Sequence, residues 1–288
     1  MTPPETSPDN LIAFQGASGA NSDIACRAAY PDMTSLPCST FADAFAAVQN
    51  GDAKLAMIPI DNTVAGRVAD IHHLLPDSGL HIIAEHFERI NHQLLALPGT
   101  KIGDIKEVHS HVHALNQCRG LLRELGVKAV VHADTAGAAA DVAHWGDKSK
   151  ASISSRLAAE VYGLEILRSD IEDAEHNTTR FVVLSRDETW PAPGSCDPIT
   201  SFVFRVRNIP ASLYKAMGGF ATNGVNMIKL ESYVGEGFII AQFYAEVEGH
   251  PDDPALKLAL EELGFFSNEV KILGVYPANA YRKTAATA

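Results

Sequence analysis

A short apolar run, a small polar loop and a segment of helical periodicity follow one another repeatedly through the first two-thirds of the chain. The apolar runs have the length of buried strands, and the segments after them place their apolar residues on one helix face. Strands that alternate with helices predict an α/β fold with a mainly parallel sheet. The runs that we interpret as strands are residues 11–14, 55–60, 107–110, 129–133, 151–154 and 181–184.

The predicted helices lie between these strands. A helix over 41–50 carries apolar residues at the i, i+3, i+4, i+7 spacing, and Gly51 ends it. The helices that follow the strands are expected to end near Ala28, Leu75, Leu125, Trp145 and Gly163.

Five of the strand-to-helix loops carry Ser, Thr, Asn or Gly. In folds of this kind, ligands bind beyond the carboxyl ends of the strands. Each loop there presents unpaired backbone N–H groups and the positive end of a helix dipole. Helix capping is the simpler explanation for any one of these residues. If several of the loops converge, they form a site suited to a carboxylate-bearing ligand.

The pattern changes after residues 187–198, DETWPAPGSCDP, which contain three prolines and one glycine and are typical of a linker. The order predicted beyond them is βαββαβ, the ferredoxin-like arrangement, which by itself says little about function. Its expected elements are strand 200–206, helix 211–221, strands 227–234 and 238–247 around Gly235-Glu236-Gly237, helix 254–263 and strand 269–276.

The charge balance opposes a nucleic-acid partner. Lys and Arg total 23 against 35 Asp and Glu, a net charge of −12, whereas a protein that binds the phosphate backbone needs a basic face. An anionic ligand must therefore be held by local positive groups. The N-terminal MTPPETSPDN has no apolar signal region, and no apolar run approaches the ~18 residues of a membrane helix. We expect a cytoplasmic protein without a membrane partner.

The cysteines give no sign of a metal site or a disulfide framework. They are scattered and form no CxxC pair, so we interpret them as reduced thiols. The four positions are Cys26, Cys38, Cys118 and Cys196.

Five motifs resemble, in family order, those of bacterial prephenate dehydratases with a C-terminal ACT regulatory domain. The resemblance runs from about residue 11 to residue 278. One such motif would be weak, whereas five in register are specific. The motifs are PIDNTVAGRVADIHHLL (59–75), NHQLL (91–95), HSHVHALNQC (109–118), DTAGAA (134–139) and NTTRF (177–181).

The resemblance implies a catalytic region of two α/β lobes, similar to type 2 periplasmic binding proteins, with the active site between the lobes. It also implies conversion of prephenate to phenylpyruvate in phenylalanine biosynthesis, regulation by phenylalanine, and a homodimer or homotetramer that pairs through the ACT domains. The chemistry requires neither a metal nor a redox cofactor. The expected organisation is a catalytic domain over 1–188, a linker over 189–198, the ACT domain over 199–278 and a tail over 279–288.

In this family the threonine before Arg-Phe is catalytic, so the resemblance makes Thr179 the leading candidate. Its hydroxyl can donate a hydrogen bond to the departing ring hydroxyl if the site is desolvated. Arg180 offers a planar fork that matches a substrate carboxylate. In the alternative interpretation, Asn177 and Thr178 form a turn and Arg180 pairs with Glu172 or Asp173.

The other candidate substrate-binding residues lie where predicted strands end and helices begin. His111 titrates near neutrality and can serve as a proton source or a carboxylate partner, although a structural role is an open alternative. Capping is the alternative for the remaining residues, and Gln117 is expected to pack within its helix. The candidates are Asn62, Thr63, Ser110, His111 and Thr135.

The regulatory end departs from the family pattern. Pro-Gly-Ala-Leu is replaced by residues 210–213, where Ala211 stands for a glycine that would let an amino-acid carboxylate approach. Glu-Ser-Arg-Pro is replaced by residues 231–234, which lack the arginine. Phenylalanine inhibition is therefore a hypothesis. The candidate effector-binding residues are Asn208, Pro210, Ala211, Ser212, Leu213, Asn226, Glu231 and Ser232.

Two alternatives to prephenate dehydratase stay open. Arogenate dehydratase acts on the aminated analogue, and one sequence does not separate the two substrates. A non-catalytic protein that binds or senses amino acids belongs to a different class. The presence of Thr179 and Arg180 together speaks against that second alternative.

Overall fold

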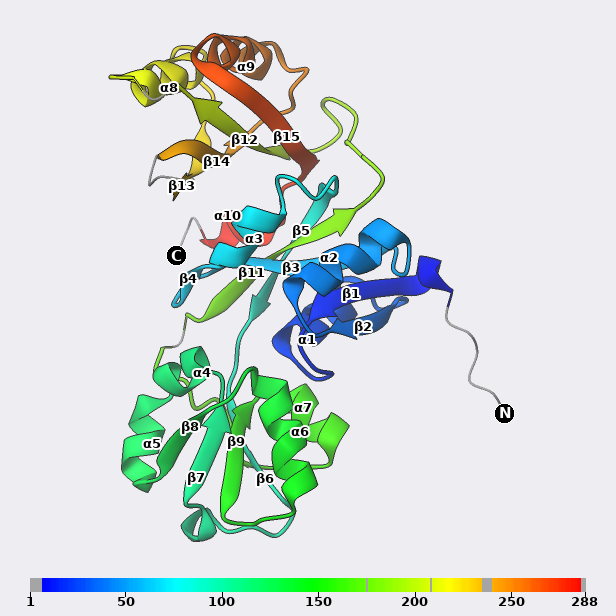
Figure 1. Cartoon of the computed structure of the whole chain (residues 1–288), viewed down its shortest axis with the longest axis vertical. Coiled ribbons are helices and arrows are strands. Elements are labelled where there is room, and N and C mark those ends of the chain that lie inside the picture. Colours follow the sequence, from blue (N-terminus) through cyan, green and yellow to red (C-terminus); the bar gives the residue numbers. More distant parts are fainter. Residues whose placement is uncertain (1–6, 175, 208, 235–239, 286–288) are drawn as a thin grey trace. The chain divides into compact units, whose positions relative to one another are not determined.

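The computed structural model describes residues 7–174, 176–207, 209–234 and 240–285 (Figure 1). The chain divides into two compact units, and each is described by itself. The first unit extends to Val68 and resumes over His86–Phe181, and the second contains Ala69–Glu85 and the chain from Val182 onward. The predicted boundaries at 188, 198 and 278 stay predictions.

A six-stranded sheet has the order β2-β1-β3-β11-β5, with β4 beside β3. Strand β1 (Leu11–Gln15) is fully buried over Ile12–Phe14, and it lies between β2 (Thr34–Cys38) and β3 (Leu55–Asn62), pairing in parallel with both. Two strands of the sheet, β5 (His81–Arg89) and β11 (Thr178–Ser185), run from one unit into the other.

The helices near this sheet follow the predicted faces and ends. Helix α2 (Phe41–Asn50) begins with a capping box between Thr40 and Asp43 and ends at Gly51, whose φ is 85°. Helix α1 (Asn21–Ala29) is also confirmed. The helix expected to end near Leu75 is confirmed as α3 (Ala69–Leu74), but it does not begin directly after residues 61–63, because the chain first forms β4 (Gly66–Arg67).

A second sheet in the first unit has five strands in the order β10-β6-β9-β7-β8. The parallel strands are β7 (Glu107–Ser110), β8 (Lys128–Val131) and β9 (Lys150–Ser154). Strands β6 (Gln93–Ala96) and β10 (Glu165–Arg168) are antiparallel to their neighbours, so this sheet is mixed rather than mainly parallel. Apolar periodicity predicts that a strand exists but carries no information on its direction.

The helices of this sheet agree with the prediction except in one place. Helices α6 (Thr135–Trp145) and α7 (Arg156–Tyr162) end at glycines in the left-handed conformation. The helix expected to reach Leu125 is two helices, α4 (Val112–Gln117) and α5 (Arg119–Leu125), which are separated at Cys118. Two short 3-10 turns, η1 (Pro8–Asn10) and η2 (Ile102–Asp104), complete the first unit.

The C-terminal elements follow the predicted β-α-β-β-α-β order and build an antiparallel sheet ordered β13-β14-β12-β15. Helices α8 and α9 share a core with its strands, in which Phe202, Phe204 and Leu263 are fully buried. The turn predicted at Gly235-Glu236-Gly237 lies outside the described residues. The elements are β12 (Pro198–Val206), α8 (Ser212–Thr222), β13 (Met227–Val234), β14 (Ile240–Glu248), α9 (Pro254–Phe266), β15 (Ser267–Pro277) and α10 (Tyr281–Ala285).

No helix within the described ranges is long and apolar enough to cross a bilayer. All four cysteines are free; Cys26 and Cys118 are buried, and Cys38 and Cys196 are half-buried.

Candidate functional site

Thr179 lies inside strand β11 rather than before it. The strand begins at Thr178, so the sheet itself fixes the backbone of Thr179 and Arg180. Asn62, at the carboxyl end of the neighbouring strand β3, donates from its side-chain Nδ2 to the Thr179 hydroxyl oxygen at 2.9 Å. The structure therefore brings two of the predicted site residues into direct contact.

The orientation of the Asn62 amide follows from its backbone contacts. Its Oδ1 accepts hydrogen bonds from the N–H groups of Val64 and Ala65, at 2.9 and 2.7 Å. The NH2 group must then face the other way, toward Thr179 and toward Asn177 Oδ1 at 2.8 Å. Because the Thr179 oxygen accepts from Asn62, its own proton points elsewhere and can serve a ligand.

The hydrogen-bond chain continues to the side of the second sheet. Asn177 is buried, and its Nδ2 donates to Gln117 Oε1 at 2.9 Å. The same oxygen lies 2.8 Å from His92 Nε2, so that ring nitrogen carries the proton. Burial lowers the pKa of His92, and the Gln117 hydrogen bond and the charge of Glu172 offset this only in part. His92 is therefore a neutral donor at pH 7.

The expectation that Gln117 packs within its helix is wrong. It is the last residue of α4, where a half-buried amide can reach out toward Asn177 and His92. Its presence in the HSHVHALNQC motif was the available signal. His92 lies in the NHQLL motif, but the sequence alone could not show that its ring contacts Gln117, which is 25 positions further along the chain.

Thr63 links the end of strand β3 to the start of strand β11 through its hydrogen bonds. Its hydroxyl donates to the His176 carbonyl at 2.5 Å and accepts from the Thr178 N–H at 2.9 Å. Its own N–H donates to the Thr178 carbonyl. The residue therefore fixes the end of β3 against the start of β11, and it does not begin a helix.

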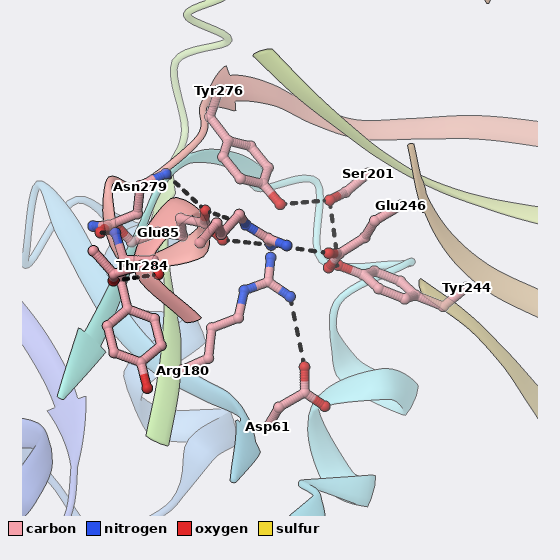
Figure 2. Close-up of polar contacts among 11 residues, drawn as sticks. Asp61, Glu85, Arg180, Ser201, Tyr244, Glu246, Tyr276, Asn279 and Thr284 are labelled. Atoms are coloured by element: carbon pink, nitrogen blue, oxygen red, sulfur yellow. Dashed lines mark hydrogen bonds and ion pairs between the residues drawn. The ribbon is translucent and has the colours of Figure 1, made fainter. Parts of the chain in front are cut away.

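Arg180 is buried and pairs with Asp61 of strand β3, whose Oδ2 lies 3.5 Å from Nη1 (Figure 2). The two carboxylates of the alternative interpretation, Glu172 and Asp173, accept hydrogen bonds from other groups. Glu172 accepts from the Asn91 side chain and the His92 N–H, and Asp173 accepts from the Gly120 N–H. The alternative interpretation, in which Arg180 pairs with Glu172 or Asp173, is therefore wrong.

The other three candidates lie at the carboxyl edge of the second sheet. Ser110 is fully buried, and its hydroxyl donates to the Ile153 carbonyl at 2.6 Å. His111 is the N-cap of α4, and burial, then the charge of His113, lowers its pKa. Thr135 is not a cap, because Asp134 holds that position and accepts from the Gly137 N–H. Contact of these three residues with a ligand stays a prediction.

The predicted effector-binding residues surround the start of α8. Ala211 has a φ of 63°, in the left-handed region that favours glycine, and the Ser212 hydroxyl bonds to the Ile209 carbonyl. Asn226 donates to Glu248 at 3.0 Å, and Glu231 pairs with Lys229 at 2.9 Å. Asn208 lies outside the described residues. Pro210 precedes α8, Leu213 packs on its core, and Ser232 belongs to β13.

A metal ion has no evident place within the part of the chain that the structure describes, where no group of three or more His, Cys, Asp or Glu residues could hold one. The residues around Thr179 instead offer neutral amide, hydroxyl and imidazole donors and one buried guanidinium. The chemistry of these donors suits an anionic or hydroxyl-bearing organic molecule.

Comparison with known proteins adds a family to this geometry. The prephenate dehydratase family model matches residues 12–189. A "Bifunctional N-acyl-homoserine lactone acylase/prephenate dehydratase" of Komagataeibacter europaeus is 54% identical over 96% of this chain and 98% of that protein. An "Arogenate dehydratase/prephenate dehydratase 1, chloroplastic" of Arabidopsis thaliana is 36% identical over 94% of this chain and 73% of that protein.

A solved structure shows the same similarity. The prephenate dehydratase of Arthrobacter aurescens, in complex with L-Phe, is 28% identical and superposes with a TM-score of 0.84, covering 96% of this chain and 97% of that one. The similarity therefore extends beyond the segment that the family model matches.

Proposed function

Because the chain belongs to the prephenate dehydratase family, and is thus a hydro-lyase, we propose that it converts prephenate to phenylpyruvate with Thr179 beside the departing hydroxyl. In this reaction the bond to the ring carboxylate breaks and its electron pair enters the ring. The ring C–O bond breaks at the same time, and the hydroxyl leaves with the electron pair of that bond and takes a proton from solvent to become water. Carbon dioxide is the other product.

The 2.9 Å bond from Asn62 to Thr179 is the observation that carries this proposal. A hydroxyl that accepts a hydrogen bond becomes a stronger donor, because polarisation passes along the chain. Thr179 then stabilises the negative charge that develops on the leaving oxygen, by hydrogen bonding rather than by full proton transfer. The neutral chain from His92 through Gln117 and Asn177 holds the Asn62 amide in this orientation.

The substrate carries two carboxylates, and positive groups near Thr179 suit them. Arg180 is our candidate for one carboxylate, since it follows Thr179 directly in β11 and its planar guanidinium matches a carboxylate bidentately. Asn62, Thr63, Ser110, His111 and Thr135 are proposed to line the rest of the site. The Thr63 and Ser110 hydroxyls already donate to carbonyls, so they would offer a ligand their oxygens as acceptors.

Regulation by phenylalanine through a C-terminal ACT domain is part of the proposal. The β-α-β-β-α-β order and the strand order β13-β14-β12-β15 fit a ferredoxin-like domain. A relative in this family binds L-Phe in its solved structure. We further propose that the protein is cytoplasmic and that two or four chains pair through their ACT domains.

Matched variants of Thr179 test the proposed reaction. Thr179→Val keeps the volume and removes the hydroxyl, so prephenate turnover should fall by about 10²–10³-fold, whereas Thr179→Ser should stay within about tenfold of the parent. The measurement is aromatic product formation at neutral pH, because prephenate aromatises unaided in acid. Equal rates for the Val and Ser variants would remove Thr179 from the mechanism.

Two further substrates should be tested beside prephenate, because relatives of this chain are named for activity on them. Arogenate is a candidate because the Arabidopsis relative carries both dehydratase names. Turnover of arogenate but not prephenate would keep the chemistry and change the substrate. Hydrolysis of N-acyl-homoserine lactones is a candidate because a relative 54% identical is named for it. Release of free homoserine lactone by Thr179→Val at the parental rate would place that activity at a different site.

A further inference from the structure

Residues of the predicted tail over 279–288 bind the buried carboxylate of Glu85, which belongs to strand β5. Asn279 donates its N–H to Glu85 Oε1 at 2.9 Å and its side-chain amide to the Glu85 carbonyl at 3.3 Å. Arg282, in α10, donates hydrogen bonds to both carboxylate oxygens of Glu85, at 2.6 and 2.7 Å (Figure 2). The Glu85 side chain is fully buried, with 0% exposure.

Arg282 also reaches a second buried carboxylate, on the C-terminal sheet. Its Nη2 lies 3.3 Å from Glu246 Oε2, and that side chain is only 1% exposed. The other oxygen of Glu246 accepts from the Tyr244 hydroxyl at 2.6 Å, and the chain continues to Ser201 and Tyr276 (Figure 2). Strands β14, β12 and β15 all contribute to it, so Arg282 bridges three strands of that sheet to β5.

Two more contacts join the same elements. Lys271 of β15 donates to the Pro76 carbonyl at 2.6 Å. A Cβ added to Gly274 would overlap the Ile82 carbonyl oxygen, so the backbones of β15 and β5 are in contact there. Ala69–Glu85 belongs to the same compact unit as the C-terminal elements, in agreement with these contacts.

We propose that residues 279–282 form a latch through which the state of the C-terminal sheet controls strand β5 and, through it, strand β11. The two strands are hydrogen-bonded neighbours, and Thr179 is the second residue of β11. A buried ion pair suits a switch because it has few intermediate arrangements. If the Arg282 guanidinium moves away, Glu85 and Glu246 both lose the positive charge that they share. The effector arm of this inference rests on the proposed phenylalanine regulation.

Arg282→Met is the direct test, with Lys283→Met as its matched control. Both substitutions remove one positive charge from α10, but the ion pair of Lys283 with Asp197 lies at the surface, where the two side chains are 75% and 76% exposed. Amide hydrogen exchange should become about tenfold or more faster over residues 81–85 and 178–181 in Arg282→Met, and unchanged in Lys283→Met. The double variant Glu85→Gln with Arg282→Gln removes the buried Glu85 charge together with the guanidinium, so that only Glu246 loses an ionic partner, and it should show the same pattern if Arg282→Met fails to fold.

The exchange comparison needs neither turnover nor an effector, so it decides the latch separately from the proposed function. Unchanged protection of β5 and β11 in folded latch variants would overturn the proposal. In a parent enzyme that phenylalanine inhibits, Arg282→Met should still bind phenylalanine by calorimetry while losing most of the inhibition. Full inhibition in that variant would also overturn it. A parent that does not turn over prephenate would instead refute the proposed function.

Discussion

The side-chain amide of Asn62 lies 2.9 Å from the hydroxyl oxygen of Thr179, although 117 positions separate the two residues in the chain. Neighbouring strands of one sheet produce this proximity, because β3 ends at Asn62 and β11 begins beside it. The backbone N–H groups of Val64 and Ala65 decide which end of the amide faces Thr179. The direction of the hydroxyl proton is therefore a consequence of a turn.

Asn62→Asp should lower kcat for prephenate by about 100-fold with little change in KM. The carboxylate keeps the acceptors for Val64 and Ala65, so the turn survives. It has no donor for Thr179, however, and it would draw the Thr179 proton toward itself and away from the leaving hydroxyl. Steady-state kinetics at neutral pH measure the effect.

Asn116→Asp is the matched control, because it adds the same charge to an exposed residue of α4 that bonds only to Arg119. A kcat for Asn62→Asp within twofold of this control would contradict the assignment.

The elements with strong periodicity were predictable from the sequence, whereas the contacts between them were not. The Phe41–Asn50 helix had a regular apolar face, a capping pair and a terminal glycine, which are all local signals. Strands β6 and β10 lacked clear alternation, and their antiparallel direction depends on how the chain crosses the sheet. Local signals therefore gave the α/β class but not the mixed sheet.

The candidate site divides in the same way. Asn62 and Thr179 could be named from motifs, and the structure shows that they touch. Gln117 was misinterpreted because its partners come from β11 and from the chain before β6. Arg282 was missed altogether, since a short polar helix near the end of a chain has no periodicity to distinguish it from a tail.

Acidification from pH 7.5 to 5.5 should destabilise the protein through its buried histidines. Burial is the largest cause that lowers the pKa of His92, His109 and His111 in the folded state. The unfolded chain, with histidine pKa values of about 6.5, then binds more protons over this window. The stabilisation is complete above about pH 6.5 and is lost as the pH falls below it.

Urea midpoints at several pH values measure this slope. His92→Gln keeps a side-chain donor for Gln117 but cannot titrate, so it should flatten the slope. A free energy of unfolding that rises on acidification through this window would show that the buried histidines gain protons on folding instead.

Gly19→Ala should destabilise the first unit by about 2 kcal/mol or more. Gly19 has a φ of 86°, and an added Cβ would lie 2.7 Å from the Ala158 Cα at the start of α7. The Ser155 hydroxyl also bonds to the Gly19 carbonyl, so the loop cannot move away without losing this contact.

Gly146→Ala is the comparison, because Gly146 has a φ of 66° with nothing within 4 Å of the added Cβ. It should cost only the backbone strain, about 1 kcal/mol. Chemical denaturation of both variants separates strain from steric overlap, and equal losses would show that the loop yields freely.

Ala211→Gly should stabilise the second unit by roughly 0.5–1 kcal/mol, the opposite of the usual effect of a glycine. At a φ of 63° the Ala211 backbone is left-handed, which costs an alanine about 1 kcal/mol or more, and the greater freedom of glycine in the unfolded chain cancels only part of the gain. Ala221→Gly, at an exposed position of the same helix α8, should destabilise by about 0.5–1 kcal/mol. Thermal melting of the pair measures both signs.

The same glycine should tighten phenylalanine binding if the effector carboxylate approaches the start of α8, because removing the Cβ opens the backbone there. Calorimetric titration of phenylalanine into Ala211→Gly and Ala221→Gly compares the two positions. Tighter binding in the first variant alone places the effector at Ala211. A lower melting temperature for Ala211→Gly than for the parent would mean that the left-handed backbone at this residue is not retained in solution.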